Sequence, residues 1–202
     1  MLPARDAQLV QIVDAAVADA ARRSGSWLLC APGCTQCCTG VFPISQLDAA
    51  RLRHGLAALD ATDPQRAHAV RARAEHSIAR LAPAFPGDPR TGALDEARAD
   101  LLEDFANDEV CPALDPATGL CDLYAARPMT CRVFGPPLRS TDEEGNTGIG
   151  VCELCYHGAT EEQIATCELH LGCDDLESAL TREAEQSSAR IGNTIVAYAL
   201  LR

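Results

Sequence analysis

The sequence contains no lysine, so all 17 of its basic residues are arginines, against 29 aspartates and glutamates. The formal net charge is −12, and the arginines form no basic run. Proteins that bind nucleic acids usually present a basic surface, because neutralisation of phosphates supplies most of their affinity. The charge therefore argues against a nucleic-acid partner.

Aromatic residues and long apolar runs are also scarce. Only 4% of the residues are aromatic, while 47% are hydrophobic and alanine is abundant. Helices that pack through small side chains suit this composition better than a β-sandwich does. No stretch approaches the ~20 apolar residues of a membrane span, and the N-terminus shows no signal-peptide or transit-peptide pattern. We therefore expect a cytoplasmic, globular chain without a membrane partner.

The familiar nucleotide-binding and hydrolase motifs are missing as well. There is no Walker-type loop, no dinucleotide-binding glycine pattern and no serine nucleophile elbow. What the chain has instead is helical periodicity with recognisable caps, such as Ser45, Asp63 followed by Pro64, and Thr160 three residues before Gln163. Helices are predicted over 6–23, 45–59, 62–82, about 94–105 and about 174–201, with a short one after Thr160.

Between Cys111 and Cys155 the helical period disappears, and prolines and glycines predict irregular loops with a short hairpin near 141–150. The fold class is therefore predicted to be mainly α: a helical scaffold whose cysteine-bearing loops converge on a metal centre. We expect a single domain over 1–202, with its cysteine core at about 30–157 and the helices 6–23 and 174–201 packed around that core.

Eleven cysteines are the most unusual feature of the chain. In a reducing compartment, clustered cysteines are more often metal ligands or redox groups than disulfides, and an odd number excludes complete pairing. The first cluster, CAPGCTQCC, has the spacing C-x3-C-x2-C-C, in which Pro32 and Gly33 predict a tight turn. Two adjacent thiolates rarely chelate one tetrahedral ion, so this cluster favours two metal ions or a polynuclear centre.

Two further groups follow, one over 111–131 and one at CELC. Arg127 and Arg132 stand close to the second group, where guanidinium groups would offset the negative charge of metal-bound thiolates from the second coordination shell. Cys167 and Cys173 stand alone and are interpreted as packing residues. The predicted metal ligands are Cys30, Cys34, Cys37, Cys38, Cys111, Cys121, Cys131, Cys152 and Cys155.

These motifs resemble the YkgJ-type cysteine-cluster family, described as zinc- or iron-chelating. The resemblance covers about 30–132, and it rests on the opening C-x3-C-x2-C-C and on CPALDPATGLCDLYAARPMTCR. It implies eight cysteine ligands and a metal. It leaves open whether Cys152, Cys155 or His157 completes the set, and the cysteines beyond eight depart from the family pattern.

An enzyme is the alternative interpretation. Cys30, Cys34 and Cys37 have the C-x3-C-x2-C spacing with which radical S-adenosylmethionine enzymes hold an iron–sulfur cluster. Those enzymes place the motif after a barrel strand, and this chain shows no alternation of strands and helices. The sequence therefore predicts a metal-binding protein holding zinc or iron, with an iron–sulfur cluster as one form of the iron. It identifies no substrate and no protein partner.

Overall fold

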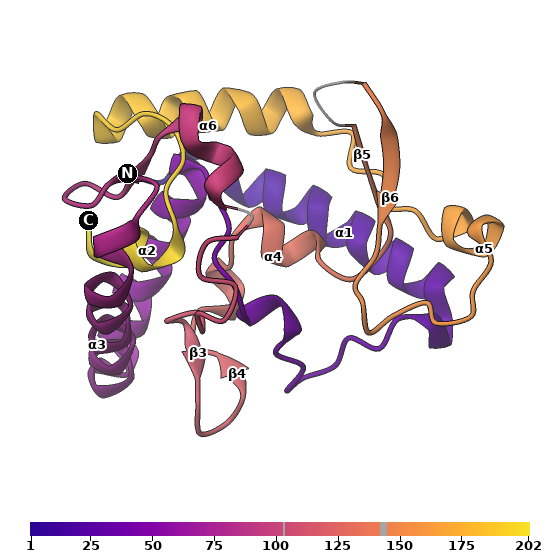
Figure 1. Cartoon of the computed structure of the whole chain (residues 1–202), viewed down its shortest axis with the longest axis horizontal. Helices are drawn as coiled ribbons and strands as arrows, with labels where there is room; N and C mark the ends of the chain where they lie inside the picture. The colour runs from indigo at the N-terminus through magenta and orange to yellow at the C-terminus, as the bar shows by residue number, and fades with distance from the viewer. Residues whose placement is uncertain (103, 142–144) are drawn as a thin grey trace. The chain divides into compact units, whose positions relative to one another are not determined.

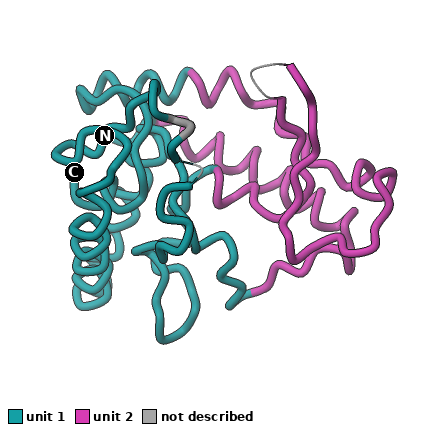
Figure 2. Tube along the Cα trace, viewed as in Figure 1, with its two compact units in different colours: residues 1–3, 32–129, 179–202 teal, residues 4–31, 130–178 magenta. Residues whose placement is uncertain are grey.

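The computed structural model describes residues 1–102, 104–141 and 145–202, and its fold is mainly α, as predicted (Figure 1). Strands occur only in two-stranded antiparallel ladders among these residues. The chain divides into two compact units, shown in Figure 2: unit 1 contains residues 1–3, 32–129 and 179–202, and unit 2 contains 4–31 and 130–178. The expectation of a single domain stays a prediction.

Unit 1 is built on three helices that pack against one another: α2 (Gln46–Thr62), α3 (Pro64–Leu81) and α7 (Val196–Leu201). The predicted caps are confirmed, since Ser45 Oγ accepts from the Asp48 amide and the Asp63 carboxylate accepts from the Arg66 amide. The core between these helices consists of alanines and branched aliphatic side chains. Cys111 and Cys121 pack against this core from outside, so the helices support the cysteine loops directly.

The remaining elements of unit 1 are short. They include the 3₁₀ turns η2 (Gln36–Cys38), η3 (Ala82–Ala84) and η5 (Tyr124–Ala126). Two small ladders pair β1 (Gly87–Asp88) with β2 (Ala93–Leu94) and β3 (Leu114–Asp115) with β4 (Leu120–Cys121). Phe85, Ile195 and Tyr198 form a second buried cluster in this unit.

Unit 2 contains α1 (Asp6–Ser24), η1 (Gly25–Trp27), the hairpin of β5 (Leu138–Thr141) and β6 (Thr147–Gly150), and α5 (Glu161–Thr166). The end of α1 is tied to the end of α5, because the Arg23 guanidinium donates to the carbonyls of Thr166 and Glu168. The predicted hairpin and the Thr160 capping box are confirmed. The predicted turn of the hairpin includes residues 142–144, which lie outside the described residues.

Two predicted helices are wrong in length or type. The helix expected over 174–201 is α6 (Asp174–Ser188) followed by a break and then α7, because Ala189 and Gly192 adopt positive φ angles of 53° and 79°. Ile191, which lies in that break, is 81% exposed. The helix expected over 94–105 is the 3₁₀ segment η4 (Glu96–Leu102), which is kinked at Arg98; residue 103 lies outside the described residues.

Candidate metal centre

Two cysteine-bearing segments of unit 1 that are far apart in sequence lie side by side. The Cys111 amide donates to the Cys38 carbonyl over 2.8 Å, and Thr39 and Val110 form an antiparallel bridge beside them. The ladder of β3 and β4 then brings Cys121 opposite Leu114, three residues after Cys111. The backbone therefore gathers Cys37, Cys38, Cys111 and Cys121 in one place.

Arginines of α3 hold the loop that carries Cys111 and Cys121. The carboxylate of Asp122, whose side chain is only 1% exposed, pairs with both Arg66 and Arg73, and Arg73 Nη2 lies 2.6 Å from Asp122 Oδ2. Arg73 Nε also donates to the Pro112 carbonyl over 2.8 Å. Pro112 and Asp122, each of which is next to a cysteine in the sequence, are thus both held by side chains of α3.

A buried ion pair holds the end of the same motif. Arg51 Nη1 lies 2.5 Å from Asp48 Oδ1, and both side chains are almost completely buried in α2. The same Oδ1 atom accepts from the Met129 amide over 3.0 Å. The segment from Cys121 to Met129 is therefore fixed at its start by Asp122 and at its end by Asp48.

Arg127 is a basic residue whose charge acts on the pKa values of these thiols. Its guanidinium lies 4.0 Å from the centroid of the Tyr124 ring, and its Nη1 donates to the Tyr124 carbonyl. Its positive charge adds to the hydrogen bond from Cys38 in lowering the pKa of Cys37, and it opposes the burial that raises the pKa of Cys121. This is the charge compensation expected of a residue beside a thiolate centre.

Cys37, Cys38, Cys111 and Cys121 have perturbed pKa values. A hydrogen bond from Cys38 is the largest cause that lowers the pKa of Cys37 to about 6, while the same contact, followed by burial, raises the pKa of Cys38. Burial raises the pKa of Cys111 to about 12 and also raises that of Cys121. The Cys37 thiolate therefore forms readily, and the thiols of Cys38, Cys111 and Cys121 need an added positive charge to lose their protons.

A second group of cysteines lies in unit 2, around a buried tyrosine. Cys152, Cys155 and Cys167 form one buried cluster with Tyr156, and the Leu29 amide donates to Cys155 Sγ over 3.4 Å. The nearby thiols Cys167, Cys155 and Cys30 all raise the pKa of Tyr156, although burial is the largest cause. Cys167, interpreted from the sequence as a packing residue, is buried in this cluster, and its position next to the CELC motif could not be predicted because the two are brought together only by the fold.

The other predicted residues of unit 2 differ in their surroundings. Cys30 is exposed and lies close to the backbone at Gly135, where a β-carbon would come within 2.8 Å of its sulfur. Cys131 is half-buried on α4 (Met129–Val133). Arg132 is buried, and its Nη1 donates to both carboxylate oxygens of Asp14 at 2.9 and 3.1 Å. His157 is exposed.

The structure thus divides the predicted ligands into two sets. Unit 1 contains Cys34, Cys37, Cys38, Cys111 and Cys121, and unit 2 contains Cys30, Cys131, Cys152 and Cys155. All eleven cysteines are free thiols. Across 1–102, 104–141 and 145–202, no three His, Cys, Asp or Glu side chains are already arranged as a metal site. The donor chemistry suits a thiophilic metal, while the side-chain geometry requires adjustment to bind one.

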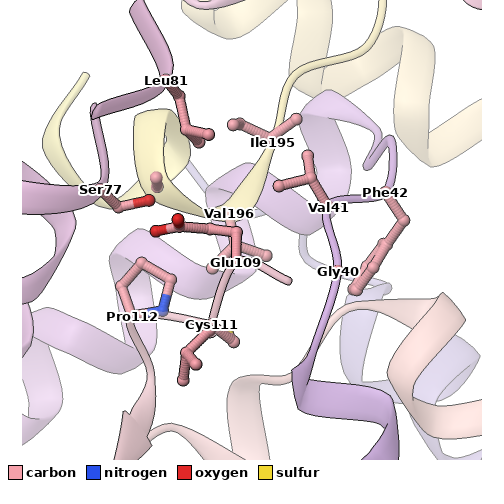
Figure 3. A pocket seen from close by; sticks show the side chains of 12 residues that line it. Gly40, Val41, Phe42, Ser77, Leu81, Glu109, Cys111, Pro112, Ile195 and Val196 are labelled. Atoms are coloured by element: carbon pink, nitrogen blue, oxygen red, sulfur yellow. The ribbon is translucent and has the colours of Figure 1, made fainter. Parts of the chain in front are cut away.

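A small cavity lies behind Cys111 in unit 1 (Figure 3). It measures about 20 Å³ and is lined by Ser77, Glu109 and apolar side chains such as Leu81 and Ile195. Glu109 also pairs with Arg80. Ser77 Oγ is buried without a hydrogen-bond partner in the part of the chain that the structure describes. This volume suits one water molecule and excludes an organic substrate.

The helical fold and the clustered thiol donors define a mainly α, cysteine-rich protein. A comparison with protein families leads to the same class of protein. Residues 29–155, more than half of the chain, match the CxxCxxCC family model, whose description is "Putative zinc- or iron-chelating domain". The chain belongs to this cysteine-cluster family. No curated protein and no solved structure matches the chain. None of the helices in the described ranges is long and apolar enough to cross a membrane.

Proposed function

We propose that this protein binds zinc or iron through its clustered cysteine thiolates, either as two ions or as one polynuclear centre. The observation that carries the proposal is the group of Cys37, Cys38, Cys111 and Cys121, whose sulfurs are close enough to shift one another's pKa values. Four thiols in one place, two of them adjacent in sequence, offer thiolate donors for two zinc or iron ions or for a polynuclear centre.

The ligand set is proposed to extend beyond these four. Cys30, Cys34, Cys131, Cys152 and Cys155 complete the nine predicted ligands, and nine thiols exceed the four that one structural ion requires. Arg127 supports the centre by its charge, and Arg132 is proposed to do so less directly because it already pairs with Asp14. A bound metal supplies the positive charge that keeps thiols with raised pKa values ionised.

Metal and acid-labile sulfide content, measured on protein purified without oxygen, tests the proposal. We expect at least one equivalent of zinc or iron, and we expect Cys37→Ser and Cys121→Ser to lose most of it. Cys173→Ser is the matched control, because Cys173 is buried outside the predicted ligand set, and it should keep the metal. Wild-type protein that binds no metal, or cysteine variants that retain it, would overturn the proposal.

The enzyme alternative gains no support from the fold. The described strands form only two-stranded antiparallel ladders, whereas a radical S-adenosylmethionine barrel needs consecutive parallel strands. Iron together with acid-labile sulfide in the purified protein would be the specific reason to test S-adenosylmethionine and oxygen as substrates. Zinc without sulfide would favour structural or storage sites.

A further inference from the structure

Unit 1 contains a second, larger cavity that no cysteine lines. It measures about 420 Å³, within the size range of small-molecule sites. Its walls come from α2, from the β1–β2 ladder region and from the break between α6 and α7 together with α7 itself. The break that the sequence pattern did not predict therefore forms part of this cavity.

Two arginines face this cavity, Arg53 from α2 and Arg190 from the break. Both are half-buried. Burial is the larger cause that lowers the pKa of Arg53, and the positive charge of Arg190 lowers it further. Throughout the described residues, neither guanidinium has an acidic side chain within ion-pair distance. At least ten of the other arginines do form ion pairs within the part of the chain that the structure describes.

Two like charges that are partly removed from water repel each other and favour a bound counter-charge. The guanidinium group presents planar pairs of N–H donors that match the oxygens of a phosphate or a carboxylate. An oxyanion between Arg53 and Arg190 would compensate both charges at once. No side chain of the described cavity wall is acidic, so nothing there competes for these donors.

The rest of the wall suits the organic part of such a ligand. Ala93 and Ile191 supply apolar surface, and the wall also includes Tyr198 and Ala199, which are almost completely buried. Hydrogen bonds hold the wall in place: Tyr198 Oη donates to the Pro89 carbonyl over 2.9 Å, and Gln46 Nε2 donates to the Gly192 carbonyl over 2.9 Å. A site held in this way needs little ordering when a ligand binds.

We infer that this cavity binds a small organic oxyanion, a phosphate- or carboxylate-bearing molecule, through Arg53 and Arg190. The inference does not depend on the metal, because the lining residues include no predicted ligand. It assigns the protein a binding site separate from the thiol cluster of unit 1.

Calorimetric titration of the metal-loaded protein with inorganic phosphate and with succinate, at constant ionic strength set by sodium chloride, tests the inference. We expect one of the two anions to bind, and the one that binds identifies the charged group. Arg53→Gln and Arg190→Gln should each weaken binding at least about tenfold, as expected for the loss of a charge-assisted hydrogen bond. Arg182→Gln, which removes an exposed arginine of α6, should leave binding unchanged.

Arg53→Lys keeps the charge and should retain part of the affinity. Circular dichroism and metal content should be the same in all four variants and the wild-type protein, so that a folding or metal defect is recognised. Absence of binding by both anions to wild-type protein, or equal binding by the Arg53→Gln and Arg190→Gln variants, would overturn the inference. Anion binding by wild-type protein that holds no zinc or iron would contradict only the proposed metal function.

Discussion

At the scale of single residues, the helical core and the cysteine motif approach each other closely at Gly55. A β-carbon at this position of α2 would lie 2.3 Å from the β-carbon of Ala126, which belongs to the 3₁₀ turn before Arg127. Neither atom can rotate away, because both are attached directly to the backbone. The turn that carries Tyr124 and Arg127 therefore depends on a glycine in a helix interior.

Gly55→Ala should destabilise the protein. Overpacking costs about 1–3 kcal/mol, which outweighs the gain of about 1 kcal/mol that alanine brings in helix propensity. Urea unfolding followed by circular dichroism measures the difference. Ala57→Ser adds one atom to an exposed position of the same helix, and its free energy of unfolding should stay within about 0.5 kcal/mol of the wild type. A more stable Gly55→Ala variant would contradict the predicted clash.

The residue types in the sequence predicted the thiol clusters, but they did not predict the ion pairs that fix the cysteine-bearing loops in place. The spacing of CAPGCTQCC and the 111–131 motif identified the cysteines, because clustered thiols are a chemical signal visible in sequence. The role of Asp122 is different: it follows Cys121 directly, yet its partners Arg66 and Arg73 lie about fifty residues earlier in α3. A contact of that kind depends on tertiary packing, which no local pattern encodes.

At the scale of elements, the β5–β6 hairpin of unit 2 is anchored by one bidentate ion pair. Arg139 in β5 donates from Nε and Nη2 to the two oxygens of Glu168, over 2.8 and 2.6 Å. These hydrogen bonds lower the pKa of Glu168 below its ordinary value of 4.5, and the charges of Arg139 and His170 act in the same direction. The pair therefore stabilises the folded chain only while Glu168 is ionised.

Glu168→Gln should accordingly have an effect that depends on pH. A carboxyl group with a lowered pKa in the folded state contributes its full stabilisation above the unfolded value, near pH 4.5, and loses it as the pH falls through the folded value. The difference in free energy of unfolding between wild type and variant should be largest at neutral pH and shrink below pH 4.5. Urea titrations at matched metal content measure it. Glu162→Gln, at an exposed position of α5, should show no such trend.

Element boundaries were predictable where a side chain caps a helix and not where the backbone breaks one. Ser45, Asp63 and Thr160 mark helix starts through hydrogen bonds that the sequence makes visible. The break after α6 has no proline, and the apolar spacing continues across it through Ile191 and Ile195. Positive φ angles at Ala189 and Gly192 end the helix instead. Periodicity alone therefore predicted one helix where the chain forms two.

At the scale of the whole molecule, the proposed ligands are distributed over both compact units. Five of the nine lie in unit 1 and four in unit 2. If all nine bind metal, removal of the metal should loosen loops in both units, because binding energy at such sites contributes directly to folding. The helices α2 and α3, which have their own apolar core, should be affected much less.

Hydrogen–deuterium exchange before and after removal of the metal by a chelator tests this distribution. We expect faster exchange over 34–40 and 111–122 in unit 1 and over 152–156 in unit 2, with little change in the middle of α3. Exchange is sensitive to local opening, so each loop reports on its own stabilisation by the metal. Cys173→Ser protein should show the same pattern as wild type. A change confined to unit 1 would limit the ligand set to Cys34, Cys37, Cys38, Cys111 and Cys121, and would assign the buried thiols of unit 2 to packing around Tyr156.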